Sequence, residues 1–218
     1  MNEKRSPRSF PLVPIAVGMI VVLGLVAVLL SRGGDDDGSG VEAGSVATGS
    51  IRETRPVSVA GAALPPHGEG VDAAVGLPAP EVTGAAFDGD AVAISNDGTP
   101  KVLMFLAHWC PHCQKEVPVV AQWIEQKGAP EGVELVSVAT ATVAERPNYP
   151  PSAWLEREGW QPVVLADDEQ GSAATAFGLT AFPFFVALDA QGKVVERVSG
   201  ELTVQQIEDL VARARGVG

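Results

Sequence analysis

The strongest constraint on the fold is the position of the chain's only two cysteines, Cys110 and Cys113, directly behind a continuous apolar run. The run covers residues 101–107 and has the length and composition of a strand buried on both faces of a sheet. Behind it, Pro111 opens a segment to about Lys127 whose apolar residues recur with helical spacing. A secreted domain held together by disulfides would carry more cysteines, spread along its length. This domain must therefore depend on its own hydrophobic core.

From about residue 75 to the end, the sequence alternates between strand and helix patterns. A hairpin with its turn at residues 189–192 precedes Thr203, which is a good N-cap for a closing helix. A strand–helix–strand start, an antiparallel hairpin and a final helix predict a three-layer α/β domain with a mixed central sheet. The other expected strands are 133–139, 162–165, 183–188 and 193–198, and the other expected helices are 152–158, 172–177 and 203–215.

The N-terminal part of the chain contains a longer apolar run, with no charged side chain between Ser9 and Ser31. About 20 apolar residues match the hydrocarbon thickness of a bilayer. Basic residues precede the run and three aspartates, residues 35–37, follow it, so the positive-inside rule places the following chain outside the cell. We therefore expect a cytoplasmic N-terminus over residues 1–9 and a single transmembrane helix over residues 10–31 in the cell membrane.

A cleaved signal peptide is the competing interpretation of this run. Such a peptide needs a small-x-small cleavage site close behind its apolar region, and the nearest candidate, residues 45–47, lies well downstream. The uncleaved anchor is preferred, and both interpretations place the domain outside the cytoplasm. Residues 32–72 are rich in Gly, Ser, Ala, Pro and acidic residues, which predicts a flexible extracytoplasmic linker before a domain over residues 73–218.

The net charge of the chain, −12 at pH 7, limits its possible partners. An acidic surface repels nucleic acid and anionic lipid head groups, so neither is an expected partner. A solvated surface that keeps the domain soluble explains the charge, which therefore does not identify a substrate.

The two cysteines lie at the junction between the predicted buried strand and the predicted helix that follows it. At the first turn of a helix, unpaired backbone N–H groups and the positive end of the macrodipole favour a thiolate over a thiol. The thiolate is the species that attacks disulfides. We therefore assign Cys110 as the exposed nucleophile and Cys113, one turn along the same face, as the resolving thiol. A purely structural disulfide is disfavoured, because a bridge across so few residues removes little entropy from the unfolded chain.

Two further interpretations of the cysteines stay open. A non-enzymatic copper or zinc carrier is one, since His108, Cys110, His112 and Cys113 are all metal-ligand residue types. Structural zinc normally takes its ligands from two separated clusters, and only this one is visible. A thiol peroxidase is ranked lower, because the chain lacks a separate Pro-x-x-x-Thr-x-x-Cys arrangement. No organic cofactor is expected.

The segments VLMFLAHWCPHCQKEVP (residues 102–118) and VELVSVA (residues 133–139) resemble the thioredoxin superfamily. Within it they resemble the TlpA/ResA-like branch of membrane-anchored thiol–disulfide oxidoreductases, and the resemblance extends over about residues 75–211. It implies a thioredoxin-like fold and a redox-active pair of cysteines. It also implies exported protein thiols or disulfides as substrates, and a membrane redox partner that recycles the dithiol.

The resemblance assigns roles to individual residues. Pro183 falls at the family's cis-proline, beside the dithiol in the loop that receives the substrate backbone, and Phe182 stands before it where many relatives have a small or β-branched residue. Glu116 matches the acid of TlpA/ResA-like proteins and could accept the proton of Cys113. Trp109 is expected to pack beside the dithiol and shield it.

The dipeptide between the cysteines, Pro111 and His112, resembles that of the exported oxidase DsbA. His112 would stabilise the Cys110 thiolate, and a more stable reduced form makes a couple more oxidising. The TlpA/ResA-like branch contains many reductases, so the direction of electron flow stays open. His108 is expected at the rim of the site.

An aromatic-rich stretch downstream adds a further expectation. Tyr149, Trp154 and Trp160 are expected to form one wall of a substrate groove.

Overall fold

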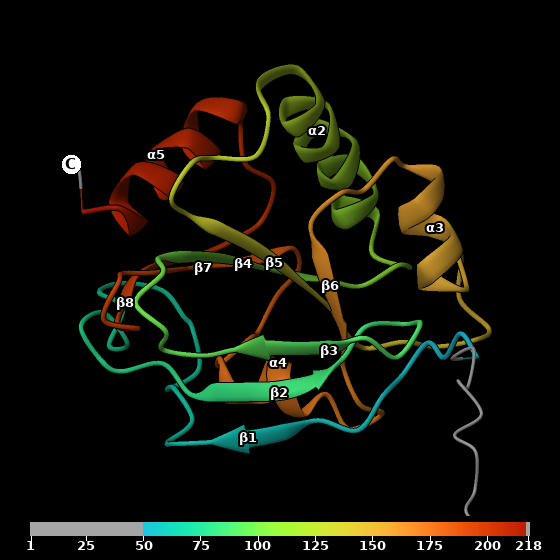
Figure 1. Cartoon of the computed structure of the whole chain (residues 1–218), viewed down its shortest axis with the longest axis horizontal. Helices are drawn as coiled ribbons and strands as arrows, with labels where there is room; N and C mark the ends of the chain where they lie inside the picture. Colours follow the sequence, from blue (N-terminus) through green and yellow to red (C-terminus); the bar gives the residue numbers. More distant parts are fainter. Residues whose placement is uncertain (1–49, 217–218) are drawn as a thin grey trace, which may run out of the picture. The chain divides into compact units, whose positions relative to one another are not determined.

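The computed structural model describes residues 50–216, and its centre is a five-stranded mixed sheet (Figure 1). Its strands are β4 (Lys101–Leu106), β5 (Glu134–Ala139), β6 (Val163–Ala166), β7 (Phe184–Leu188) and β8 (Val194–Ser199). They lie in the order β6-β5-β4-β7-β8, in which β4, β5 and β6 are parallel. β7 runs antiparallel to β4, and β8 antiparallel to β7. The predicted α/β class with a mixed sheet is confirmed.

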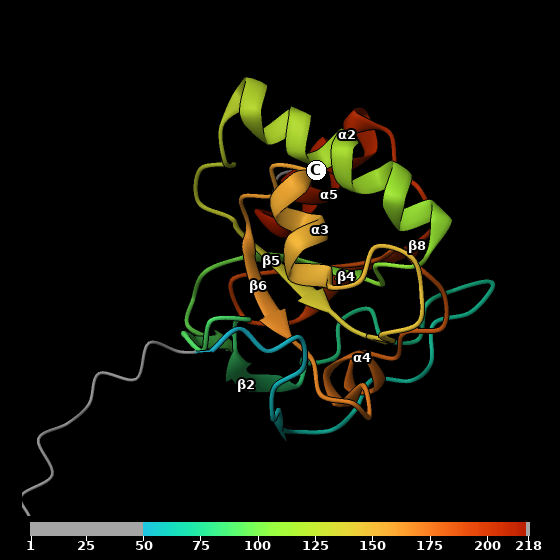
Figure 2. The ribbon, with the colours of Figure 1, turned by 90° about the vertical axis from the view of Figure 1, so that its right-hand side faces the viewer.

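Layers of helices and strands cover both faces of this sheet (Figures 1 and 2). One face carries α2 (Pro111–Lys127), α3 (Pro151–Arg157) and α5 (Val204–Ala214). The other face carries α4 (Ser172–Ala176) and a three-stranded antiparallel sheet. The strands of that second sheet are β1 (Ser58–Ala60), β2 (Glu81–Ala85) and β3 (Ala91–Ile94). This small sheet is an addition that the sequence patterns did not predict.

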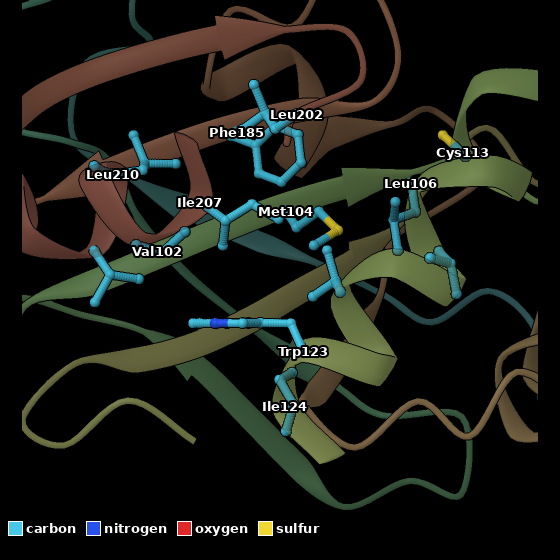
Figure 3. Packing of buried hydrophobic residues seen from close by; sticks show 14 of the residues in the cluster. Val102, Met104, Leu106, Cys113, Trp123, Ile124, Phe185, Leu202, Ile207 and Leu210 are labelled. Atoms are coloured by element: carbon cyan, nitrogen blue, oxygen red, sulfur yellow. The ribbon is translucent and has the colours of Figure 1, made fainter. Parts of the chain in front are cut away.

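Two hydrophobic clusters fix the sheet between its layers. Side chains alternate along β4, so Met104 and Leu106 pack under the helices while Leu103 and Phe105 pack on the opposite side. All six residues of β4 are buried, which explains why its sequence is apolar from Val102 to Leu106. Lys101, at the start of the strand, is buried as well and pairs with Asp97 and Glu134. Figure 3 shows the helix-side cluster, with Cys113 near Leu106 at its edge. The reactive pair therefore lies at the border of the core.

Local signals set the ends of the C-terminal elements. Asp189 accepts hydrogen bonds from the backbone N–H groups of Gln191 and Lys193 and so forms the turn between β7 and β8. Thr203 forms a capping box with Gln206 at the start of α5, as its N-cap role predicts. Both features confirm the sequence-based assignment of this part of the chain.

The linker predicted over residues 32–72 needs correction from residue 50 onward. Leu64 is buried in the cluster on the far side of the sheet from α2, and its N–H donates to the carbonyl of Ala176. Glu53 accepts hydrogen bonds from the backbone and hydroxyl of Ser152 and so caps α3. Residues 50–72 are therefore part of the folded domain, because their few apolar and charged side chains bind partners distant in sequence.

The firmest attachment of this segment is a buried ion pair. The guanidinium of Arg197, on β8, donates to both carboxylate oxygens of Asp72. It also donates to the carbonyls of Pro65 and Phe177, at 2.9 Å each. The Arg197 hydrogen bond holds the pKa of Asp72 below its usual value. We call this arrangement the Arg197 clamp.

The predicted transmembrane helix, residues 10–31, and the cytoplasmic segment before it lie outside the described residues. Within residues 50–216, no helix combines the length and hydropathy needed to cross a bilayer.

Candidate active site

The site forms at one edge of the five-stranded sheet because of the strand directions. β4, β5 and β8 run the same way, so the segments that follow them begin at one edge. Cys110 follows β4, the loop 140–150 follows β5, and Glu201 follows β8. Pro183 immediately precedes β7, which runs in the opposite direction and starts at this edge. Segments remote in sequence thus meet where open α/β sheets usually carry their sites.

Cys110 is the N-cap of α2, with extended backbone angles (φ −75°, ψ 121°). Its carbonyl accepts the first helical hydrogen bond, from Gln114 N–H at 3.0 Å. Pro111 occupies the first helical position, where a missing N–H removes no hydrogen bond. This geometry is the one expected from the sequence.

Both cysteines are free thiols, and both are buried. Cys110 is 7% exposed and Cys113 is 0% exposed. The prediction that the nucleophile is exposed is therefore wrong, since Cys110 is largely buried. The reason is that both cysteines belong to the helix-side hydrophobic cluster. Cys110 is still the only one of the pair with accessible surface, so an incoming substrate sulfur can reach it first.

Cys113 is held as a neutral thiol. Burial raises its pKa above the usual thiol range, and the nearby Cys110 and Glu116 add to this effect. A thiol of this kind does not attack until a neighbouring group takes its proton.

Glu116 is a buried carboxyl on the same helix, one turn beyond Cys113. Burial raises the pKa of Glu116 to about 7, although the backbone N–H of Leu202 donates to its Oε2 at 2.9 Å. Its Oε1 is also buried and makes no hydrogen bond within residues 50–216. A solvated surface carboxylate is thus excluded, and the group has the environment of a proton acceptor that works near neutral pH.

His112 lies on the exposed side of α2 and is bonded to a residue from the far end of the chain. Its Nδ1 lies 2.6 Å from Oε1 of Glu201, and Nζ of Lys115 lies 3.4 Å from the same oxygen. Glu201 belongs to the loop between β8 and α5, residues 200–203. The His112 bond holds the pKa of Glu201 below its usual value, so the carboxylate is ionised.

An aromatic pair stands beside the dithiol. The Phe182–Pro183 peptide bond is cis, as the family resemblance implies. Phe182 meets Trp109 edge to face, with ring centroids 6.0 Å apart and an interplanar angle of 80°. Both rings pack against the cluster that contains the cysteines. The carbonyl of Pro183 accepts a hydrogen bond from Gly200 N–H, which ties the cis-proline to the loop that carries Glu201.

His108 was expected at the rim, and this expectation is wrong. Its side chain is buried, and its Nε2 accepts from Val143 N–H at 3.2 Å. Its Nδ1–H then donates to the carbonyl of Pro147 at 2.7 Å. Because both ring nitrogens are hydrogen-bonded to the backbone of the loop that follows β5, His108 holds that loop in place.

The predicted groove wall is only partly supported. Trp154 is buried in the core, and Trp160 is half-buried and donates to Ser137. Both therefore serve packing, because Trp154 lies on the buried side of α3 and Trp160, between α3 and β6, packs on the same cluster and bonds to β5. Tyr149 is 45% exposed and lies edge-on to His108, so it alone of the three can face a ligand.

The metal-carrier alternative is not favoured by this geometry. No group of three or more His, Cys, Asp or Glu side chains within residues 50–216 is arranged to hold a metal ion. His108 and His112, two of the four expected ligands, are bound to protein groups instead.

Sequence patterns did not identify Glu201 or Leu202, which bind His112 and Glu116 from 89 and 86 residues away. Neither belongs to a local motif. The available signal was topological, because a strand parallel to β4 brings the residues that follow it to the edge occupied by Cys110.

Comparisons with known proteins show which family this chain belongs to. The Redoxin family model matches residues 74–211. Thiol-disulfide oxidoreductase ResA of Geobacillus thermodenitrificans is 30% identical over 139 residues, covering 62% of this chain and 75% of that protein. A thioredoxin family thiol:disulfide interchange protein from Chlorobium tepidum is similar in structure, with a TM-score of 0.53 and 25% identity over 68% of this chain and 100% of that one. StoA from Bacillus subtilis gives a TM-score of 0.53 at 20% identity, over 62% and 98% of the two chains, which supports the thioredoxin-like fold.

Proposed function

The chain belongs to the redoxin family, and we propose that it exchanges thiols and disulfides with exported proteins, from an N-terminal anchor in the cell membrane. One observation carries the proposal. Cys110 is the N-cap of α2 at the site edge, and Cys113 lies buried behind it. One turn beyond Cys113 is Glu116, whose Oε1 has no hydrogen-bond partner in the part of the chain that the structure describes. A nucleophile, a resolving thiol and a proton acceptor thus stand in the order that disulfide exchange needs.

In the first step the Cys110 thiolate attacks one sulfur of a substrate disulfide. The substrate S–S bond breaks, its other sulfur leaves as a thiolate and takes up a proton, and a mixed disulfide joins Cys110 to the substrate. The positive end of α2 favours the attacking thiolate, because the unpaired N–H groups of the first helical turn face its N-cap.

In the second step Cys113 resolves the mixed disulfide. Its thiol gives its proton to Glu116, and the new thiolate attacks the sulfur of Cys110. The Cys110–Cys113 disulfide forms, and the second substrate sulfur leaves as a thiolate that takes up a proton. Two electrons pass from the cysteine pair to the substrate. Of the two protons that the substrate thiolates take up, one is balanced by the Cys113 proton released through Glu116 and the other comes from solvent. A carboxyl with a pKa of about 7 can take the proton and release it again at neutral pH.

The same steps in reverse oxidise a substrate dithiol, and a membrane redox partner then returns the pair to its starting state. The loop around the cis bond at Phe182–Pro183 is where we place the substrate backbone, beside the edge-to-face rings of Trp109 and Phe182.

The proposed location follows from the N-terminal segment. The uncharged apolar run between Ser9 and Ser31, with basic residues before it and acidic residues after it, supports a single-pass anchor with the domain outside. Fractionation of cells tests this, since the full chain should sediment with membranes and remain there after a high-salt wash. Recovery of the full chain in the soluble fraction would refute the anchor.

The reaction is tested with a protein disulfide, such as insulin, and a chemical reductant that recycles the enzyme. The wild type should reduce the substrate, and Cys110→Ala should abolish the reaction. Cys113→Ala should instead accumulate a mixed disulfide that a reductant releases. Equal activity of wild type and Cys110→Ala would disprove the proposal.

A further inference from the structure

We infer that Glu201 is a positioning residue that lowers the reduction potential of the Cys110–Cys113 couple, by opposing the effect of His112 on the reduced form. The inference rests on the proposed function and concerns the regulation of the same site. It bears on the direction of electron flow, which the residues between the cysteines alone leave open.

The Glu201 carboxylate lies close to two basic side chains of α2. Glu201 Oε1 lies 2.6 Å from His112 Nδ1 and 3.4 Å from Lys115 Nζ, so one carboxylate oxygen binds both basic side chains at the start of α2. When His112 is protonated, its positive charge is therefore balanced by the negative charge of Glu201. The bond also fixes the ring, because a nitrogen held by a carboxylate keeps its hydrogen and its direction.

The backbone on both sides of Glu201 is hydrogen-bonded to other parts of the site. Its loop is attached to the site at two other points, since Leu202 N–H donates to Glu116 and Gly200 N–H donates to the carbonyl of Pro183. The backbone that carries Glu201 is therefore fixed by bonds to the proton acceptor and to the cis-proline loop. The negative charge of Glu201 also adds to the effect of burial in raising the pKa of Glu116.

The sign of the effect follows from charge. A cation near Cys110 stabilises its thiolate, which stabilises the reduced form and makes the couple more oxidising. A carboxylate that binds the cation and adds a negative charge acts in the opposite sense. Removing the charge of Glu201 should leave the site more positive, and so raise the reduction potential.

The test is the thiol–disulfide equilibrium of the full-length chain with glutathione buffers at pH 7 and low salt. Glu201→Gln should shift the equilibrium constant toward the reduced enzyme by about threefold, which equals about 14 mV for a two-electron couple. The shift is small because both side chains are exposed, and it should shrink as salt is added. Glu201→Asp keeps the charge and should stay close to the wild type.

Glu208→Gln is the matched control. Glu208 is a partly exposed carboxylate of the C-terminal region that also binds α2, but its partners are Lys127, the last residue of that helix, and the indole N–H of Trp123. Removal of its charge should leave the potential unchanged. Melting temperatures of all variants show whether a shift reflects loss of structure instead.

Each outcome decides one of the two claims. An unchanged or lowered potential in Glu201→Gln, with the wild type in normal exchange with glutathione, overturns this inference alone. An equal shift in Glu208→Gln also overturns it, because the effect would then not depend on position. A wild type whose thiols ignore the glutathione buffer overturns the proposed function, and this inference with it.

Discussion

At the scale of single residues, Glu116 links the chemistry of the site to the stability of the domain. It is buried in the first turns of α2, holds a single backbone hydrogen bond from Leu202, and has a pKa of about 7. Such a carboxyl is costly to ionise in the folded state and is retained where the charge is useful. The protonation of Glu116 should therefore affect both the rate at which the mixed disulfide is resolved and the free energy of unfolding.

The catalytic consequence is tested with Glu116→Gln. The amide has nearly the same shape but cannot accept the proton of Cys113, so resolution of the mixed disulfide should slow by roughly 100-fold, the lower end of typical general-base effects. Attack by Cys110 should be little affected. Rapid-quench measurements that separate the two steps provide the check. A resolution rate within twofold of the wild type would exclude Glu116 as the acceptor.

The stability consequence has a definite sign. Folding raises the pKa of Glu116 from 4.5 to about 7, so between these pH values the native state binds more protons at this group than the unfolded state. The free energy of unfolding should therefore fall as the pH rises through this window, by on the order of 3 kcal/mol from this group.

Denaturant titrations of the reduced protein at pH 5 and pH 8 test this assignment. Glu116→Gln should be similar to the wild type at pH 5 and more stable at pH 8. Parallel pH dependences of the two proteins would mean that Glu116 is not the group responsible.

At the scale of elements, the Arg197 clamp decides where the domain begins. Arg197 on β8 binds Asp72 and the carbonyls of Pro65 and Phe177, and thus holds a segment whose composition resembles a linker. Its guanidinium is fully buried and Asp72 is only 13% exposed, so these partners have little access to water if the guanidinium is removed.

Arg197→Met tests the contribution of the clamp. Loss of one partner of a buried ion pair should reduce the free energy of unfolding by about 3 kcal/mol or more, because Asp72 and two carbonyls lose their donor. Arg213→Met is the matched control, since the exposed Arg213–Glu196 pair should contribute less than about 1 kcal/mol. Both free energies of unfolding are measured by chemical denaturation. Equal losses in Arg197→Met and Arg213→Met would show that the clamp contributes no more than an exposed ion pair.

The elements that could be predicted from the sequence are those whose pattern is strong and local. β4 is apolar from Val102 to Leu106 because it is buried on both faces, and α5 carries its own capping box. β1 could not be predicted, since it has three residues and all are exposed. Likewise, the composition of residues 50–72 does not reveal Arg197, a partner that becomes available only when the chain is folded.

The same distinction applies to the site. Cys110, Cys113 and Pro183 could be identified because short motifs mark them, and their placement at one edge agrees with the resemblance. The burial of Cys110 could not be predicted, because it depends on a cluster assembled from several elements. The Glu201 contact with His112 was also beyond a local pattern, since its two residues are 89 positions apart.

At the scale of the whole molecule, the sheet directions gather one redox pair, one buried acid and one exposed charge network at a single edge. The proposed N-terminal anchor would hold this edge outside the membrane, where exported substrates are available.

The reduction potential of the wild-type dithiol tests the account most directly. Full-length protein is equilibrated with glutathione buffers, and the thiols of Cys110 and Cys113 are counted by alkylation. A single reversible two-electron transition is predicted, with a potential less negative than the approximately −270 mV of thioredoxin, because His112 favours the reduced form even with Glu201 beside it. A pair that does not change its redox state across these buffers would contradict the account.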